Sequence, residues 1–268
     1  MIDINTRYKI SDKEKKFFRK NGFIKLKNIL TTELLGIYGE EISKKVSEHN
    51  TLKIPMSKRN TYQKACLQVM NLWRESKIVK EFVFGKRLAA IAADLLSVNG
   101  VRLYHDQALF KEVSGGHTPW HADQYYWPLE TEKTCTAWIP LQDTPLEMGP
   151  LSFAAESQNF EYGRDFKISD ESEEQIQSAL NEEQYVSIKE PFELGEVSFH
   201  YGWTFHRAGP NYSGISRKAM TIIYMDSEMR LKKPENENQQ ADWDTWCPGA
   251  RVGNIIESEL NPVLYSKE

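Results

Sequence analysis

The sequence predicts an all-β core with flanking helices (α+β), folded as a double-sheet barrel or jelly roll. Three observations predict it: a first third patterned as helices, short β-rich segments at even spacing after it, and Gly, Pro and Asn turn signals between those segments. A single core of this size is common among β proteins, so we expect one domain over residues 1–268. Its parts are a mainly helical flank in 1–100, the jelly-roll core in 101–230 and a C-terminal tail in 231–268.

The helical flank begins with a short helix and a strand. Ser11-Asp-Lys-Glu14 has the spacing of a capping box, and Asn21-Gly22 ends the helix before a strand at residues 23–26. A second helix is predicted over residues 32–49, because apolar residues recur there at helical spacing. Residues 68–73 also have helical apolar spacing, so we place them in the helical part of the chain.

The predicted core carries one helical insertion. The acidic stretch 169–184 separates its strands, and Ser172-x-x-Gln175 has the spacing of a second capping box, with acidic residues near the positive end of the helix. We therefore predict an exposed helix there, with a solvated acidic face rather than a functional patch. The strands of the core are expected over residues 101–113, 134–141, 185–188, 196–200 and 218–225.

Composition indicates an ordinary globular protein with a small-molecule partner. Hydrophobic residues make up 40% and charged residues 27%, and the formal net charge of -4 gives no electrostatic footprint for nucleic acid. The N-terminal residues carry charges where a signal peptide needs an apolar core, and no apolar run approaches membrane-spanning length. The three cysteines are far apart and form no Cys-x-x-Cys pair. We therefore expect a cytoplasmic protein without a membrane partner.

One histidine has the spacing of a metal site. Of the six histidines, only His121 has an aspartate, Asp123, two positions later. Residues i and i+2 of a strand point to the same face, so this pair is predicted to bind one ion from neighbouring positions of a strand. A chance His-x-Asp arises on the order of once in three such chains, so the spacing by itself decides nothing.

A second histidine and an arginine sharpen this prediction. His206 is followed eleven residues later by Arg217, at the head of a β-rich strand. Two imidazoles and one carboxylate on one face leave three positions of an octahedral iron open, as in the facial triad of Fe(II) oxygenases. A guanidinium inside a barrel needs a planar anion, and a carboxylate accepts both arms of its fork. The iron ligands and Arg217 are therefore predicted to share one cavity.

Five stretches of the sequence resemble one known family. They are Lys20-Asn-Gly-Phe23, Trp120-His-Ala-Asp-Gln-Tyr-Tyr-Trp127, Thr136-Ala-Trp-Ile-Pro-Leu-Gln-Asp-Thr144, Glu147-Met-Gly-Pro-Leu151, and the segment from His206 to Arg217. Through them nearly the whole chain resembles the phytanoyl-CoA dioxygenase family of Fe(II)/2-oxoglutarate-dependent oxygenases. The resemblance implies a double-stranded β-helix, which is a cupin-like jelly roll.

The resemblance also implies an enzyme and the roles of its site residues. His121, Asp123 and His206 would be the catalytic iron ligands, and Arg217 would bind the far carboxylate of the co-substrate 2-oxoglutarate. The implied reaction uses O2 and hydroxylates an unactivated carbon of a small molecule, with release of succinate and CO2. Relatives that are halogenases lack the carboxylate ligand, so Asp123 argues against halogenation. The alternatives are a jelly roll that binds metal and ligand without turnover, and a metal-dependent isomerase or hydrolase that uses another ion.

Two further residues are assigned to the co-substrate by the same resemblance. Trp138 would line its pocket, and Gln107 would contact it from the strand before His121. The sequence departs from the family pattern at two places. Ala208 stands where the family often has a hydroxyl residue, and Ala155-Glu-Ser-Gln158 replaces its frequent Pro-Gly-Ser-His turn. The first departure removes one hydrogen bond to the co-substrate.

Three other histidines have open roles. His200 competes with His206, since both come after the β-rich stretch 195–199, but only His206 has an arginine eleven residues downstream. We therefore place His200 in the pocket wall or, hydrogen-bonded, in the core. His105 and His117 are either substrate contacts or hydrogen-bonded structural histidines.

The substrate is expected to contact several segments. Gln68 and Asn71 would reach over the mouth of the barrel, while Tyr125, after the ligand strand, and Trp203, between the two late histidines, would form a substrate wall. Core packing is an equal interpretation of the two aromatic residues. The C-terminal stretch 242–249 is either a lid or a tail docked on the barrel.

Overall fold

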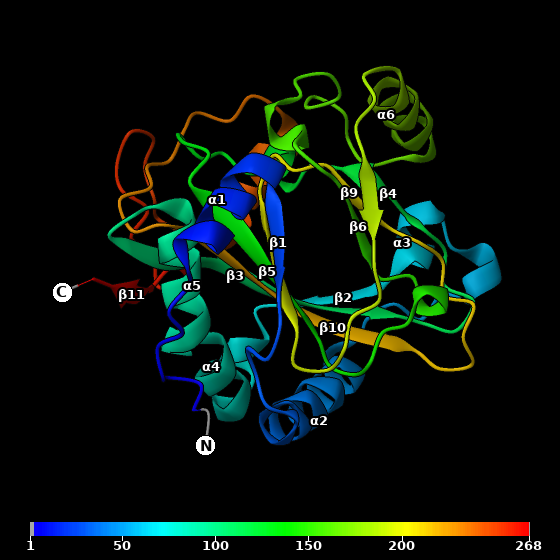
Figure 1. Cartoon of the computed structure of the whole chain (residues 1–268), viewed down its shortest axis with the longest axis horizontal. Coiled ribbons are helices and arrows are strands. Elements are labelled where there is room, and N and C mark those ends of the chain that lie inside the picture. The colour runs from blue at the N-terminus through cyan, green and yellow to red at the C-terminus, as the bar shows by residue number, and fades with distance from the viewer. Residues whose placement is uncertain (1–2, 268) are drawn as a thin grey trace.

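Two antiparallel sheets form the core, with helices packed around them (Figure 1). The computed structural model describes residues 3–267. The large sheet has the order β1-β8-β5-β10-β3-β11, with β2 beside β3, and the small sheet has the order β4-β9-β6-β7. The strands are β1 (Phe23–Leu26), β2 (Leu67–Met70), β3 (Gly100–Lys111), β4 (Thr118–His121), β5 (Thr134–Pro140), β6 (Leu151–Ala154), β7 (Ser187–Lys189), β8 (Val197–Tyr201), β9 (His206–Ala208), β10 (Arg217–Asp226) and β11 (Val263–Ser266). This is the predicted double-stranded β-helix.

Most helices precede the core strands in the chain. They are α1 (Asp12–Asn21), α2 (Thr32–His49), α3 (Thr61–Ala65), α4 (Lys77–Val83), α5 (Lys86–Leu96), α6 (Asp170–Glu182) and α7 (Glu237–Trp246). Short 3-10 turns are η1 (Met56–Lys58), η2 (Leu72–Arg74), η3 (Asp123–Tyr126), η4 (Leu146–Met148) and η5 (Ser157–Asn159). Among residues 3–267, no helix is both long enough and apolar enough to cross a bilayer.

The main hydrophobic core lies between the large sheet and the N-terminal helices. One cluster joins buried residues of α1, α2, α4 and α5 to those of β3, β5, β8 and β10, such as Ile42, Phe82 and Met220. These helices cover one face of the large sheet, which leaves its other face toward the small sheet (Figure 1). The burial of this apolar surface stabilises the packing of the helices against the large sheet.

Local signals set the N-terminal elements as predicted. Ser11 Oγ accepts from the Glu14 backbone N–H, and the Glu14 carboxylate accepts from the Ser11 backbone N–H at 2.6 Å, which completes the capping box. Gly22 ends α1 with φ of 81°, a left-handed conformation that favours glycine. The strand β1 and the helix α2 have the predicted bounds, and each predicted core strand lies within two residues of its observed bounds.

The insertion helix α6 begins at a different cap from the predicted one. Ser169 is its N-cap, because Ser169 Oγ accepts from the Ser172 backbone N–H at 3.0 Å. The predicted box from Ser172 to Gln175 was wrong, since Ser169 already caps the helix and places Ser172 inside the first turn. Ile176 and Leu180 are buried, so this helix packs on the barrel with one face.

One acidic residue of α6 is part of the small sheet's framework rather than of a solvated face. Glu173 Oε2 accepts from the backbone N–H of Trp120 on β4 at 2.5 Å. Glu173 Oε1 accepts from Arg207 Nη1 of β9 at 2.7 Å, and the Arg207 guanidinium lies over the Trp120 ring. The carboxylate therefore joins α6 to the two strands that carry His121 and His206.

Residues 68–73 form a strand and a turn, so the helical prediction for them was wrong. Residues 67–70 are β2, which pairs with β3, and residues 72–74 are η2. Asn71 between them has φ of 51° and is buried. The buried Asp106 carboxylate on β3 accepts from the backbone N–H of Leu72 at 3.1 Å and of Trp73 at 3.3 Å. Pairing with β3 thus outweighs the local apolar spacing.

Candidate metal centre

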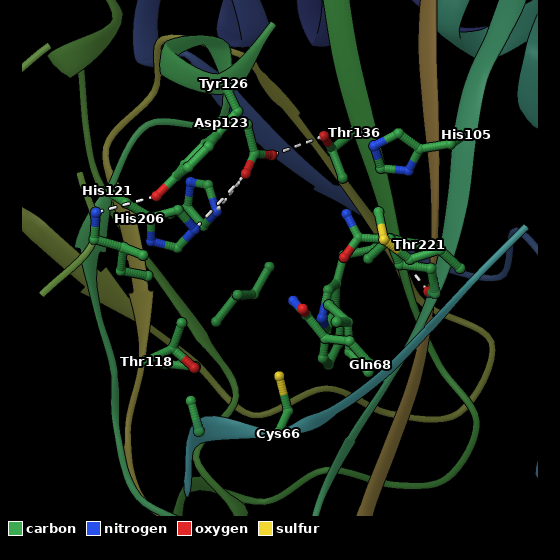
Figure 2. Close-up of a pocket in the computed structure, with 18 of the residues that line it drawn as sticks. Cys66, Gln68, His105, Thr118, His121, Asp123, Tyr126, Thr136, His206 and Thr221 are labelled. Carbon is green, nitrogen blue, oxygen red and sulfur yellow. Dashed lines mark hydrogen bonds and ion pairs between the residues drawn. The ribbon is translucent and has the colours of Figure 1, made fainter. Parts of the chain in front are cut away.

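Two histidines and one aspartate meet in the interior (Figure 2). His121 ends β4 and His206 begins β9, and the antiparallel register places them opposite each other. Asp123 begins η3, so the chain turns directly after β4 and brings the carboxylate to the imidazoles. Ligand atoms of the three residues all lie within 4.8 Å of one another, which suits one shared metal ion. The predicted strand geometry for His121 and Asp123 was wrong, because Asp123 lies on a turn, although the two side chains do meet.

Backbone carbonyls fix the orientation of both imidazoles. His121 Nδ1 lies 2.7 Å from the Pro119 carbonyl, and His206 Nδ1 lies 3.0 Å from the Thr204 carbonyl. A carbonyl oxygen only accepts, so each Nδ1–H donates and each Nε2 keeps its lone pair for a metal. Burial, and next to it the charge of a neighbouring imidazole, lower the pKa of each histidine to about 4. At neutral pH both rings are therefore in the neutral form that binds metals.

The two carboxylate oxygens of Asp123 face different neighbours. Oδ1 lies 3.7 Å from Nε2 of His121 and 3.7 Å from Nε2 of His206. Oδ2 accepts a hydrogen bond from Thr136 Oγ1 at 3.0 Å and lies 3.4 Å from Nε2 of His200. Burial alone would raise the pKa of Asp123, but the imidazoles more than offset it and hold that pKa below its ordinary value. Oδ1 is the oxygen turned toward the two free Nε2 atoms.

A buried arginine lies at the start of β10. Arg217 Nη1 donates to the Gly149 carbonyl at 2.6 Å, and its guanidinium carbon lies 5.6 Å from the centroid of the Trp138 ring. Gly149 has φ of 65°, and a Cβ there would lie 2.1 Å from the Gly209 carbonyl oxygen, so this turn requires glycine. Burial lowers the pKa of Arg217 to about 10, which leaves it cationic at neutral pH. Its Nε has no hydrogen-bond partner among residues 3–267.

A second buried cation and a hydroxyl lie near Arg217. Lys111 on β3 is the register partner of Arg217 on β10, and its Nζ donates to the Gly116 carbonyl and to Thr118 Oγ1. Burial and then the nearby Arg217 charge lower the pKa of Lys111 to about 7. Thr118 lies opposite Ala208 across β4 and β9. Thr118 therefore provides a hydroxyl directly across the β4–β9 pair from Ala208, which has no hydroxyl.

One cavity of about 370 Å³ is bordered by the clustered ligand residues, Arg217 and Thr118. Both sheets contribute to its lining, and His121, Asp123, His206 and Arg217 all border it. The other predicted residues that line it are Trp138, Gln107, Gln68, His105 and His200. Figure 2 shows Gln68 and Cys66 projecting from the β2 side toward the cavity, on the far side from Asp123.

Four residues with predicted or open substrate roles do not line this cavity: Asn71, Tyr125, Trp203 and His117. Asn71 is buried beside Asp106, as described above. Tyr125 Oη accepts from Asn238 Nδ2 at 3.1 Å, and the Trp203 ring lies 4.6 Å from the Arg164 guanidinium. The His117 Nε2 atom lies 3.8 Å from Asp170 Oδ1.

Several cavity residues were missed from the sequence. Thr136, which binds Asp123, lies within a β-rich segment that gave no polar signal for it. Asp242 and Trp246 belong to α7, so the C-terminal stretch is neither loose nor distant from the site. Their spacing of four residues is the signal that could have placed both on one helical face. Tyr62 and Cys66 on and after α3 gave no comparable signal.

The sequence is similar to known proteins. The phytanoyl-CoA dioxygenase (PhyH) family profile matches residues 18–219. The probable alpha-ketoglutarate-dependent hypophosphite dioxygenase of Stutzerimonas stutzeri is 24% identical over 153 residues, which are 54% of this chain and 52% of that protein. The match thus spans about half the length of this curated relative.

Three solved structures with a similar fold are 17–21% identical to the chain. The alpha ketoglutarate dependent carbocyclase SnoK from nogalamycin biosynthesis has a TM-score of 0.77, with 21% identity and coverage of 95% of this chain and 96% of its own. The epimerase SnoN, in complex with Fe3+, alpha ketoglutarate and nogalamycin RO, has a TM-score of 0.78, with 21% identity and coverage of 95% and 98%. EctD from S. alaskensis, with 2-oxoglutarate and 5-hydroxyectoine, has a TM-score of 0.72, with 17% identity and coverage of 94% and 86%.

The fold and the site together define a jelly-roll protein with a candidate metal centre of two histidines and one carboxylate. Since the family profile matches most of its length, the chain belongs to the phytanoyl-CoA dioxygenase family. The family resemblance read from the sequence motifs is thereby confirmed.

Proposed function

We propose that the protein is a non-haem Fe(II)- and 2-oxoglutarate-dependent dioxygenase that hydroxylates a carbon of a small-molecule substrate. The observation that carries this proposal is a single cavity bordered by the converging His121, Asp123 and His206 atoms and by the buried cation Arg217. Two proteins of the same fold support it, since SnoN was solved with Fe3+ and alpha ketoglutarate and EctD with 2-oxoglutarate.

The donor set fits ferrous iron. Two neutral imidazoles and one carboxylate take one face of an octahedral ion and leave three positions for a chelating co-substrate and O2. The Nδ1–H donors of His121 and His206 are used by backbone carbonyls, which turns each Nε2 inward. Thr136 binds Oδ2 of Asp123, so Oδ1 remains free to bind the metal. These three residues would therefore hold the iron.

The surroundings of Arg217 fit the far carboxylate of 2-oxoglutarate. An unpaired charge in a dry interior is costly, and the Nε of Arg217 has no partner within residues 3–267. A planar carboxylate accepts two parallel hydrogen bonds from such a guanidinium. The Thr118 hydroxyl accepts from Lys111, so its own proton is available to a carboxylate in the cavity. Trp138 and Gln107 would complete this end of the site.

The bound iron and 2-oxoglutarate would supply the oxidation of a carbon–hydrogen bond by O2, with release of succinate and CO2. The chain would contribute position and exclusion of water. Thr136 keeps the Asp123 carboxylate in one orientation, and Arg217 fixes the distance of the co-substrate from the imidazoles. Apolar walls such as Leu109, Leu151 and Trp138 keep bulk water away from the reacting carbon.

Anaerobic addition of Fe(II) and 2-oxoglutarate tests this proposal. We expect a weak visible charge-transfer band, followed by slow succinate formation when air is admitted. The variant Asp123→Ala should give neither signal, because it loses one of three iron ligands. A colourless wild-type protein that forms no succinate, with or without candidate substrates, would contradict the proposal and favour a jelly roll that binds ligands without turnover.

Product analysis tests the hydroxylation itself. Proteins of this fold include a carbocyclase and an epimerase, as well as EctD, which was solved with a hydroxylated ligand. Substrates can be sought by substrate-stimulated succinate release among acyl thioesters, amino acids, phosphonates and natural products. A product that gains one oxygen atom from 18O2 supports hydroxylation. A product that only loses two hydrogens, or one of unchanged mass, would contradict it.

A further inference from the structure

The C-terminal helix α7 places an acidic and an aromatic side chain in the cavity. Asp242 and Trp246 are four residues apart, so they lie on one helical face, and both border the cavity. The helix is attached to η3, because Gln239 Nε2 donates to the Tyr125 carbonyl and Asn238 Nδ2 donates to Tyr125 Oη, both at 3.1 Å. The turn that begins with the candidate iron ligand therefore also holds α7 in place.

Asp242 is oriented by one hydrogen bond, which comes from Tyr104. Tyr104 Oη, from the buried face of β3, donates to Asp242 Oδ2 at 2.9 Å. Burial raises the pKa of Asp242 to about 7; the Tyr104 hydrogen bond opposes this and the charge of Asp123 adds to it. Within residues 3–267, no lysine, arginine or histidine takes part in an ion pair with Asp242. Its Oδ1 is thus available to a ligand.

Aromatic side chains share the cavity lining with this carboxylate. Trp246, Trp127 and Tyr126 border the cavity, and the His105 ring lies 5.2 Å from the Trp246 ring. Burial lowers the pKa of His105 to about 4, so His105 adds no positive charge at neutral pH. The faces of tryptophan and tyrosine rings attract cations, and the attraction is stronger for a desolvated cation than for an exposed one. This part of the cavity therefore suits positive charge and disfavours anions.

The net charge of the cavity also favours a cationic ligand. This count assumes that iron and 2-oxoglutarate are bound, as in the proposed function. Apart from histidines, the acidic and basic side chains in its lining are Asp123, Asp242 and Arg217. A ferrous ion, the two carboxylates of 2-oxoglutarate, Asp123 and Arg217 together carry no net charge. Lys111 lies outside this lining, and its ammonium binds Thr118. Asp242, when ionised, is then the acidic group of the lining that these partners leave uncompensated. A substrate with a positive charge would compensate it.

We propose that the cavity binds the cationic group of its substrate, an amine or a quaternary ammonium, against the Asp242 carboxylate and the Trp246 ring. This inference names the substrate class for the proposed function and rests on it. The bound cation fixes the substrate at one end, and a carbon of the same molecule then faces the iron ligands. Because α7 is attached to η3, both ends of the substrate would be held by the same unit of structure.

Two pairs of small molecules test the inference, since the members of each pair differ in charge but little in shape. Choline is paired with 3,3-dimethylbutan-1-ol, and butylammonium with butan-1-ol. Ligand-observed NMR titrations give the dissociation constants, on the metal-free protein and on the anaerobic protein with Fe(II) and 2-oxoglutarate. We expect at least one cation to bind tenfold or more tightly than its neutral partner.

Matched variants on α7 assign this preference to one carboxylate. Asp242→Asn keeps the shape and the Tyr104 contact, and it should reduce the ratio of dissociation constants to about one. Asp244→Asn, on an exposed residue of the same helix, should leave the ratio unchanged. Equal binding of cation and neutral partner in both pairs, no binding of either cation, or a preference that survives Asp242→Asn would each overturn the inference.

The failure of this inference and that of the proposed function are distinguishable. The charge-transfer band and succinate formation of the wild-type protein report on iron and 2-oxoglutarate alone. A protein that shows both signals without preferring cations contradicts the inference and keeps the proposed function. A protein that prefers cations but shows neither signal contradicts the proposed function and keeps the cation site of Asp242.

Discussion

His200 Nε2 lies 3.4 Å from Oδ2 of Asp123, whereas Nε2 of His206 lies 3.7 Å from Oδ1. The two histidines thus contact opposite sides of one carboxylate. Since His121 also lies on the Oδ1 side, a metal ion bound there would be shared by His121 and His206, with His200 on the opposite side of the carboxylate. This relationship gives a geometric reason to prefer His206 over His200 as a ligand.

The first prediction concerns these two histidines. His206→Ala should abolish iron retention, because it removes one of three ligands, while His200→Ala should keep close to one iron per protein. Metal analysis after anaerobic loading and desalting measures this, with circular dichroism as the control for folding. Equal loss of iron from two folded variants would exclude our choice of ligand.

The second prediction concerns Arg217. Arg217→Gln should weaken 2-oxoglutarate binding tenfold to a hundredfold, because a hydrogen bond to a charged group contributes about 1.5–3 kcal/mol. Iron retention should not change, since Arg217 is not among the clustered ligand residues. Titration of the charge-transfer band with 2-oxoglutarate measures the affinity, and Arg251→Gln, at an exposed position, is the control. Unchanged affinity in Arg217→Gln would contradict the assigned role.

The third prediction concerns the hydroxyl across from Ala208. Thr118 Oγ1 accepts from Lys111, so its proton is free to bind the co-substrate carboxylate. Thr118→Val should therefore raise the dissociation constant of 2-oxoglutarate about tenfold or more, because a hydrogen bond to a charged group contributes about 1.5–3 kcal/mol. Thr118→Ser keeps the hydroxyl and should restore most of the affinity. If Thr118→Val and Thr118→Ser bind 2-oxoglutarate equally well, the Thr118 hydroxyl has no such role.

The fourth prediction is a pH dependence of stability from Asp106. Burial raises the pKa of this carboxyl to about 7, although the backbone N–H groups of Trp73 and Leu72 oppose the rise. Between the unfolded value of 3.8 and about 7, the folded protein holds a proton that the unfolded chain has lost. The stabilising contribution is therefore complete below the unfolded pKa and is lost as the pH rises through about 7.

Comparison of two proteins isolates this effect from other titrating groups. Asp106→Asn keeps the acceptor oxygen for one backbone N–H and cannot ionise. Urea unfolding of the metal-free proteins should show wild type losing stability relative to Asp106→Asn from pH 4 to 7, by at most a few kcal/mol, since one pKa unit is about 1.4 kcal/mol. A constant difference across this range would contradict the raised pKa of Asp106.

Elements with local signals were predictable from the sequence. The capping box of Ser11 and Glu14 and the glycine after α1 act within a few residues, so neighbouring side chains alone decide them. The apolar periodicity of α2 and the turn residues between core strands are local in the same way. Residues 68–73 were misassigned because their hydrogen bonds go to β3, more than thirty residues away, and no local pattern records that pairing.

By itself the sequence determined the jelly-roll class, the candidate ligands His121, Asp123 and His206, and the presence of Arg217. These depend on residue types and spacings, which can be read directly from the linear sequence. Only the tertiary structure decided that Asp123 comes from a turn, that Thr118 faces Ala208, and that Asp242 of α7 borders the same cavity. The physical reason is that strand register and helix docking are set by long-range pairing and by burial of apolar surface, which no local segment contains.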